Sequence, residues 1–318
     1  MVSILSIDDG FDPALAALRA GELVAVPTET VYGLAADASS EDAVQRIFAA
    51  KGRPDFNPLI AHVSDLAMAR RVGQFDDLSL ELAKAFWPGP LTIVVPLKTD
   101  AGIAPAVTAG LGTIALRQPK GVMVRLAEAL GNPIAAPSAN SSGKISPTLA
   151  NHVAGDLGDK VSVILDDGPC SVGLESTIVR AENNALILLR EGGISRERLT
   201  GTINAPLIEK ASKAIEAPGQ LLSHYAPSLP LRLEATSVRD SDALLAFGRD
   251  ALPGTPLAVR NLSVDGDLGE AAHNLFAMMK ELDQSGARAI AVQSVPRHGI
   301  GLAINDRLAR AAHGNRDV

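Results

Sequence analysis

Two kinds of hydrophobic spacing alternate along this chain from its first residues onward. Apolar residues three and four apart predict helices; the first is expected between Asp12-Pro13 and Gly21, and the next between Ser39-Ser40 and Gly52. Short continuous apolar runs predict strands at 23–26, 59–63, 91–97, 113–117, 134–136 and 161–165. Further helices are expected near 77–86, 120–130 and 148–155. This alternation predicts an α/β fold with a twisted mixed sheet covered by helices.

The second half of the chain carries a hairpin signal, a linker and another alternating segment. Asn183-Asn184 separates the apolar runs 176–180 and 185–189, and Asn tolerates the positive φ of a tight hairpin turn. After a Pro-containing stretch without sustained period, strands are expected at 229–233, 256–259 and 287–292, and helices near 239–247, 268–284 and 301–313. We therefore predict a first α/β domain over 1–205, a linker over 206–228, and a small parallel, Rossmann-like α/β domain over 229–318.

Composition and charge narrow the class of protein. The 318 residues include one cysteine, which leaves no disulfide framework and fits a reducing compartment. The net charge is −7, with 17 basic and 23 acidic residues in 1–205 and 12 and 13 in 206–318, so neither part is basic overall. The start MVSILSIDDGFDP lacks the basic region of a signal peptide, and no apolar run approaches the ~18 residues of a membrane span. We expect a soluble cytoplasmic protein without membrane contact that binds any anionic ligand in a local basic pocket.

The first candidate for chemistry is Pro27-Thr28-Glu29-Thr30-Val31-Tyr32-Gly33-Leu34, directly after a predicted strand. Ligands of open α/β sheets bind beyond the carboxyl ends of strands, and Thr hydroxyls in such a turn can hold carboxylate or phosphate oxygens. Thr and Gly are also common in ordinary turns, so the motif alone leaves both interpretations open.

The second candidate, Lys51-Gly52-Arg53-Pro54, stands at the exit of a predicted helix. Two cations one residue apart can clamp phosphates, with Arg as a planar fork and Lys as a point charge. Taken alone, such a pair is more typical of a solvated helix C-terminus, where the helix dipole favours cations. His62, taken alone, is more typical of an ordinary strand histidine.

The third candidate is a strand that runs into Pro137-Ser138-Ala139-Asn140-Ser141-Ser142-Gly143. Ser and Asn can donate to an anion or recognise a base or ribose edge, although an Asx or Ser turn has the same composition. Arg117 and Arg190 each end a predicted buried strand, where a cation needs an anionic partner. For these two arginines we favour ligand contacts over plain salt bridges.

Taken in order, these segments are far more specific than any of them alone. The chain contains PTETVYGL, KGRP with NPLI and His62, WPGPLT, TIALR, APSANSSG, ESTIV and LLREG. Over about residues 8–205 it closely resembles the threonylcarbamoyl-AMP synthases with a YrdC-like domain. HYAP and the later GLAINDRLARAA resemble the two-domain form of that family, with a linker and a C-terminal extension domain. Motifs of P-loop NTPases, dinucleotide oxidoreductases, zincins and α/β-hydrolases are absent from the sequence.

The resemblance implies an ATP-dependent nucleotidyltransferase that makes threonylcarbamoyl-AMP and pyrophosphate from L-threonine, bicarbonate and ATP. This is the first step of threonylcarbamoyladenosine formation in tRNA, with hand-over to the tRNA-modifying machinery and little direct tRNA binding. Mg²⁺ should accompany ATP, and no metal-ligating residue is assigned, because phosphates and waters largely hold such an ion.

The family motifs also imply roles for individual residues. The central catalytic and nucleotide-binding set would be Lys51, Arg53, Ser138 and Asn140. The threonine-binding residues would be Thr30, His62, Arg117, Ser138 and Ser176. The ATP-binding residues would be Arg53, Asn57, Thr113, Asn140, Thr148, Arg190 and Tyr225. Because Tyr225 lies in the linker, the linker is expected to act as a lid.

Two alternatives come from other classes of protein. A non-catalytic RNA-binding or ribosome-associated module could use the same cationic surface, although a net charge of −6 over 1–205 argues against it. A carbamoyl-transfer protein of hydrogenase maturation also contains a YrdC-like segment, but a single cysteine provides no paired CxxC zinc modules.

Overall fold

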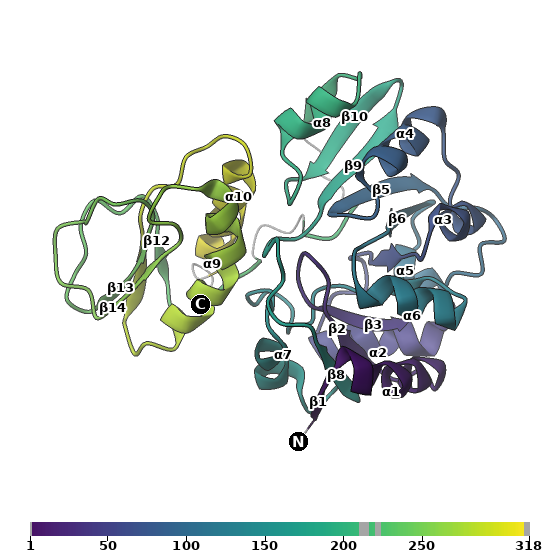
Figure 1. The fold of residues 1–318 in the computed structure, drawn as a ribbon, viewed down its shortest axis with the longest axis horizontal. Helices are drawn as coiled ribbons and strands as arrows, with labels where there is room; N and C mark the ends of the chain where they lie inside the picture. The colour runs from purple at the N-terminus through teal and green to yellow at the C-terminus, as the bar shows by residue number, and fades with distance from the viewer. Residues whose placement is uncertain (1, 210–215, 220–223, 315–318) are drawn as a thin grey trace.

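The computed structural model describes residues 2–209, 216–219 and 224–314, and these form two α/β units with one sheet each (Figure 1). The N-terminal unit carries an eleven-stranded mixed sheet and the C-terminal unit a four-stranded parallel sheet. The predicted fold class is confirmed. The predicted domain and linker boundaries stay predictions, since much of the expected linker, 210–215 and 220–223, lies outside the described residues.

The large sheet combines parallel and antiparallel neighbours. In spatial order its strands are β1 (Ser3–Ser6), β8 (Val163–Asp166), β2 (Val24–Val26), β3 (Gly33–Asp37), β7 (Ile134–Ala135), β4 (Ile60–His62), β6 (Thr113–Arg117), β5 (Leu91–Pro96), β9 (Thr177–Glu182), β10 (Ala185–Arg190) and β11 (Leu207–Glu209). The hydrophobic pattern does not predict β1, β3 or β11. β11 pairs in parallel with β10, so the large sheet extends into the segment that the sequence assigns to the linker.

Eight helices are described in the N-terminal unit. They are α1 (Ile7–Arg19), α2 (Glu41–Lys51), α3 (Leu66–Val72), α4 (Asp77–Phe86), α5 (Pro105–Thr108), α6 (Val122–Leu130), α7 (Ala150–Leu157) and α8 (Arg196–Thr202). The predicted start of the first helix at Asp12-Pro13 is wrong. Ser6 caps α1 by accepting a hydrogen bond from the amide of Asp9 at 3.2 Å, and Pro13 lies inside the helix.

Local sequence signals place two further features as expected. Ser40 caps α2 through the amide of Ala43, and Gly52 ends it with a left-handed φ of 60°. Asn183 and Asn184, at φ 51° and 59°, join the antiparallel strands β9 and β10. The end of α2 therefore delivers Lys51 and Arg53 to a fixed position beside the sheet.

The C-terminal unit has the strand order β12 (Leu231–Arg232), β15 (Ala289–Val292), β13 (Asp242–Ala246) and β14 (Ala258–Asn261), with helices α9 (Leu268–Asp283) and α10 (Gly301–His313). The predicted helix near 239–247 is wrong, because Asp242–Ala246 is a fully buried strand between β15 and β14. A five-residue apolar run does not show whether it is strand or helix.

None of the helices described in the chain is both long and apolar enough to cross a bilayer.

The two units share one hydrophobic cluster. It joins Val31, Ile145 and Leu174 of the N-terminal unit to Phe276 and other side chains of the C-terminal unit. Gly173 has a φ of 75°, and a Cβ there would lie 2.5 Å from the carbonyl oxygen of His273 on α9. Only glycine permits this approach, so the backbone of one unit packs directly against the other.

Candidate active site

The centre of the site lies where two parallel strands end side by side. β4 and β6 pair so that His62 stands opposite Arg117, both buried. Arg117 donates from Nη1 to Oγ1 of Thr30 at 2.8 Å, and its Nη2 lies 2.8 Å from Oε1 of Glu29. The loop after β2 therefore supplies a hydroxyl and a carboxylate to one guanidinium. Nε of Arg117 also donates to the carbonyl oxygen of Gly89 at 3.2 Å. Arg117 therefore forms a buried salt bridge, contrary to the expectation that favoured ligand contacts.

The exit of α2 contributes two buried cations. Lys51 donates from Nζ to the carbonyl oxygen of Ser138 at 2.5 Å and also to that of Asn140. Arg53 donates from Nε to the carbonyl of Asn57 at 3.1 Å and from Nη2 to that of Pro58 at 2.8 Å. Burial lowers the pKa of Lys51 well below its ordinary value, helped by the charge of Arg53, and burial lowers the pKa of Arg53 to about 10. An anion at this position would stabilise both charged forms.

A fourth buried cation, Arg190, comes from the end of β10. Arg190 donates from Nε and Nη2 to the carbonyl oxygen of Ser176 at 3.1 and 2.9 Å, and from Nη1 to the carbonyl of Pro218 at 3.1 Å. The hydroxyl of Ser176 also lies 2.7 Å from that of Thr92. Burial lowers the pKa of Arg190 to about 10. Arg190 thus ties the start of β9 to the segment after β11.

These side chains converge on one pocket, whose lining includes eight of the predicted site residues. They are Thr30, Arg53, His62, Arg117, Ser138, Ser176, Arg190 and Tyr225. Burial, and next the charge of Arg117, lower the pKa of His62 to about 3, so this imidazole is neutral near pH 7. The pocket therefore combines a neutral histidine with three arginines and several hydroxyl groups.

Five predicted residues do not line this pocket: Lys51, Asn57, Thr113, Asn140 and Thr148. Three of them carry a buried polar atom that has no hydrogen-bond partner in the described part of the chain, namely Oδ1 of Asn57, Oδ1 of Asn140 and Oγ1 of Thr148. Thr113 begins β6 and shares the sheet face of Arg117, four residues further on. The catalytic, threonine-binding and ATP-binding roles of the individual residues stay predictions.

The linker residues His224 and Tyr225 cover one side of the pocket. Their ring centroids lie 4.0 Å apart, and Tyr225 stacks on Phe276 of α9 at 5.5 Å. Burial raises the pKa of Tyr225 above its ordinary value, and burial lowers that of His224 to about 3. Nδ1 of His224 is another buried atom that lacks a partner among the described residues. In this arrangement both rings are held between the two units.

Sequence reasoning did not select two acidic residues and one arginine of the site. Glu29 pairs with Arg117, and Glu175, on the pocket wall, pairs with Arg307 of α10 at 2.8 Å. Both acids lie within the motifs PTETVYGL and ESTIV, so their position next to predicted ligand residues was an available signal. Arg307 lies in the segment GLAINDRLARAA, but its pairing with Glu175, 132 residues away in the chain, has no local signal.

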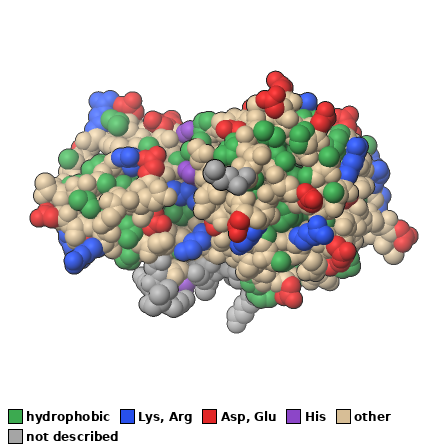
Figure 2. Space-filling model, turned by 90° about the horizontal axis from the view of Figure 1, so that it is seen from below, with side chains coloured by type: hydrophobic (Ala, Val, Ile, Leu, Met, Phe, Trp, Pro, Cys, Tyr) green, Lys and Arg blue, Asp and Glu red, His purple; other side chains and the backbone are tan. Residues whose placement is uncertain are grey.

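The distribution of charged side chains favours a local ligand pocket over an extended nucleic-acid-binding surface. Figure 2 shows acidic and basic side chains interspersed over the face that it presents. Three of the buried cations, Arg53, Arg117 and Arg190, by contrast line one pocket at the strand ends. Fold and site together define a two-unit α/β protein with a small-molecule pocket for anionic ligands, and the charge distribution disfavours a long RNA track.

Comparison with known proteins agrees with this class. Residues 16–192 match the family model Sua5_yciO_yrdC, described as telomere recombination, and residues 194–313 match the model of the threonylcarbamoyl-AMP synthase C-terminal domain. Threonylcarbamoyl-AMP synthase of Bacillus subtilis is 40% identical over 95% of this chain and 92% of its own, and that of Pyrococcus abyssi is 38% identical over 93% and 92%. A crystal structure of P. abyssi Sua5 complexed with L-threonine superposes with a TM-score of 0.86 at 36% identity, covering 96% of this chain and 94% of that one. The chain belongs to the Sua5/YciO/YrdC family, in its form with the additional C-terminal domain.

Proposed function

We propose that this protein is a threonylcarbamoyl-AMP synthase, a nucleotidyltransferase that uses L-threonine, bicarbonate and ATP. The observation that carries the proposal is the set of buried cations Lys51, Arg53 and Arg190. In the described part of the chain they donate to carbonyl and hydroxyl oxygens and form no ion pair with a carboxylate. Buried cations are costly without anionic partners, and the phosphates of ATP would supply them.

Threonine would bind at the ends of β4 and β6. Arg117 would hold the threonine carboxylate, with Thr30 and Ser176 as hydroxyl partners. His62 is neutral in this environment and would accept or donate a single hydrogen bond without adding charge. The crystal structure of the P. abyssi relative in complex with L-threonine supports the assignment of threonine as the amino-acid substrate.

ATP would occupy the side of the pocket formed by the α2 exit and the Ser138–Asn140 loop. Arg53 and Arg190 would contact phosphates, and the unpartnered oxygens of Asn57, Asn140 and Thr148 would gain partners. Lys51 uses two of its three N–H donors on carbonyl oxygens, which leaves one for a phosphate oxygen.

The proposed reaction proceeds in two steps. The threonine amine adds to CO₂ derived from bicarbonate and loses a proton, which gives a carbamate. A carbamate oxygen then forms a bond to the α-phosphorus while the bond from that phosphorus to the bridging oxygen of the β-phosphate breaks, and pyrophosphate leaves. The cations would stabilise the charge that develops on the leaving group, and the pocket would hold the two anionic reactants together.

Mg²⁺ belongs to this proposal as a companion of ATP. The described residues contain no group of three or more His, Cys, Asp and Glu side chains that could hold a metal ion, and Glu29 and Glu175 are each engaged by an arginine. The site therefore fits an ion held mainly by phosphates and waters, whose charge would assist pyrophosphate departure. A cytoplasmic location, and hand-over of the product to a tRNA-modifying partner, remain predictions from the sequence.

Release of pyrophosphate tests the proposal. Purified protein with ATP, Mg²⁺, bicarbonate and threonine should release pyrophosphate, and omission of threonine should abolish the release. Threonine-independent release would indicate a simple ATPase or pyrophosphohydrolase. Tight, salt-sensitive tRNA binding with no nucleotide chemistry would instead support the RNA-binding alternative.

A further inference from the structure

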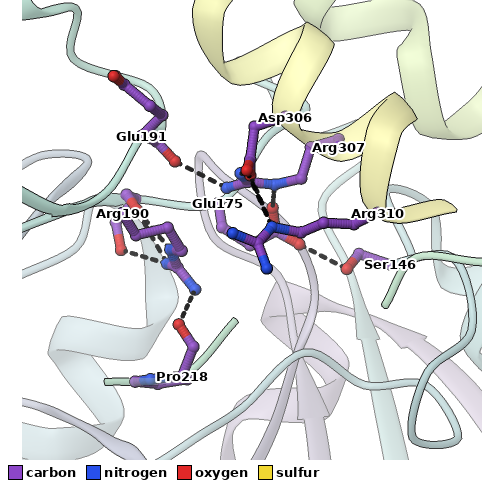
Figure 3. Close-up of polar contacts among 9 residues, drawn as sticks. Ser146, Glu175, Arg190, Glu191, Pro218, Asp306, Arg307 and Arg310 are labelled. Carbon is purple, nitrogen blue, oxygen red and sulfur yellow. Dashed lines mark hydrogen bonds and ion pairs between the residues drawn. The ribbon is translucent and has the colours of Figure 1, made fainter. Parts of the chain in front are cut away.

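Arg307 of the C-terminal unit contacts Glu175 in the wall of the pocket. Arg307 lies on α10 and is fully buried, with an exposed fraction of 0%. Its Nε donates to Oε2 of Glu175 at 2.8 Å, and its Nη2 donates to the carbonyl oxygen of Glu191 at 2.8 Å (Figure 3). Both acceptors belong to the N-terminal unit, so Arg307 joins the two units at the site.

Each acceptor stands next to a residue of the predicted ligand-binding set. Glu175 precedes Ser176 and Glu191 follows Arg190, and Arg190 donates to the carbonyl and hydroxyl oxygens of Ser176. One guanidinium therefore fixes both ends of the Ser176–Arg190 contact. Its Cζ also lies 4.9 Å from the ring centroid of Tyr225, which lines the same pocket.

The contact with Arg307 also affects the charge of Glu175. Burial acts to raise the pKa of Glu175, but Arg307 foremost, then Arg190 and the hydroxyl of Ser146, bring that pKa below its ordinary value. Glu175 is thus ionised at neutral pH while it lines a pocket for anions. Removal of Arg307 would leave a buried carboxylate facing the bound phosphates, and it would also free the loop that carries Ser176.

We propose that Arg307 is a positioning residue for the reaction: it neutralises Glu175 at the pocket wall and thereby makes the C-terminal unit part of the ATP site. This inference rests on the proposed function, since it assumes that the pocket binds ATP. It assigns a task to one residue of the segment GLAINDRLARAA in the last helix. Arg307 itself acts through Glu175, Ser176 and Arg190.

The test compares ATP affinity in full-length variants, measured with a non-hydrolysable ATP analogue by calorimetry. Arg307→Met should weaken binding at least tenfold, because the carboxylate of Glu175 then repels the phosphates. In the double variant Arg307→Met with Glu175→Gln, removal of that charge should recover at least threefold of the loss. Arg310→Met, one turn further on the same helix, removes a guanidinium that pairs with Asp306, which is also a partner of Arg307, and should stay within twofold of the wild type.

A merely structural bridge would behave differently. It would lower the melting temperature of Arg307→Met and leave the affinity for the ATP analogue within twofold of the wild type, and that result would overturn the proposal. Equal loss in the single and double variants, both folded by circular dichroism, would overturn it as well. If Arg307→Met does not fold, Arg307→Lys applies the same test: it keeps the charge but cannot reach Glu175 and Glu191 together, and should weaken binding by an intermediate factor. Wild-type binding to the analogue without threonine-dependent pyrophosphate release would count against the proposed function, not against the role of Arg307.

Discussion

Arg117 donates from Nη1 to the hydroxyl of Thr30 at 2.8 Å, beside the carboxyl ends of the parallel strands β4 and β6. The second Nη lies 2.8 Å from Glu29, so the guanidinium is held from two sides by one loop. Such a pre-oriented fork loses little conformational freedom when a carboxylate binds. The end of the pocket proposed to bind threonine is thus formed before any ligand arrives.

This geometry predicts the effect of Arg117→Lys. Lysine keeps the charge but lacks the planar fork, so KM for threonine should rise at least tenfold while KM for ATP changes less than threefold. Steady-state pyrophosphate release with one substrate varied at a time measures both. A comparable rise in both constants would show that Arg117 serves the whole pocket rather than the threonine end.

Lys51→Met should affect both rate and stability. The substitution removes the proposed phosphate donor, so the rate should fall at least tenfold. It also leaves two carbonyl oxygens without their donor, so the free energy of unfolding should fall by about 1–3 kcal/mol. Lys160→Met is the matched control, since Lys160 donates to the carbonyl of Ala50 from the outside of the same helix end. Urea unfolding and pyrophosphate assays should separate the two variants, and equal activities would contradict the role given to Lys51.

Thr148→Val should change stability and affinity in opposite directions. The hydroxyl of Thr148 is buried without a partner in the described chain, so its removal should raise the free energy of unfolding of the ligand-free protein by about 1 kcal/mol. The same change should weaken ATP binding severalfold. Thr177→Val provides the contrast, because that hydroxyl donates to the carbonyl of Ile194 at 2.6 Å and its loss should destabilise. A destabilised Thr148→Val variant with normal ATP affinity would refute the assignment.

Buried histidines predict a loss of stability in acid. Burial lowers the pKa values of His62 and His224 to about 3, whereas an unfolded histidine titrates near ~6.5. Between these values the unfolded chain binds more protons, so the free energy of unfolding falls with falling pH by up to about 1.4 kcal/mol per unit for each histidine. His224→Gln should flatten this slope between pH 6.5 and 5, and the exposed His313→Gln should not. Urea unfolding at several pH values measures the slopes, and an unchanged slope in His224→Gln would contradict the buried neutral state.

Much of the fold could be predicted because local pattern and burial agree. The helices at 77–86 and 301–313 occur as expected, since each has a helical period and a clear end, and the short apolar run at 113–117 forms the expected strand. The strand at 242–246 was predicted as a helix because its apolar run is short and fully buried. Tertiary pairing with β14 and β15, which no local signal encodes, decides its conformation.

Some residues of the site could likewise be predicted from the sequence, and others could not. Arg117 and Arg190 stand out in the local sequence because each ends a predicted buried strand, whereas Arg53 is selected only through the resemblance to the family. The pairing of Glu29 with Arg117 and of Glu175 with Arg307 cannot be read from neighbouring residues in the sequence. Arg307 reaches Glu175 across the contact between the two units, whose side chains share the hydrophobic cluster around Phe276.

Isotope labelling tests the central claim most directly. With ATP, Mg²⁺, L-threonine and ¹³C-bicarbonate, mass spectrometry should reveal an adenylate that carries both threonine and one labelled carbon, formed in step with pyrophosphate. Lys51→Met should lower the yield of this adduct at least tenfold. Pyrophosphate released without a labelled threonyl adduct, or an adduct that lacks the labelled carbon, would contradict the account of the site as a threonylcarbamoyl-AMP synthase.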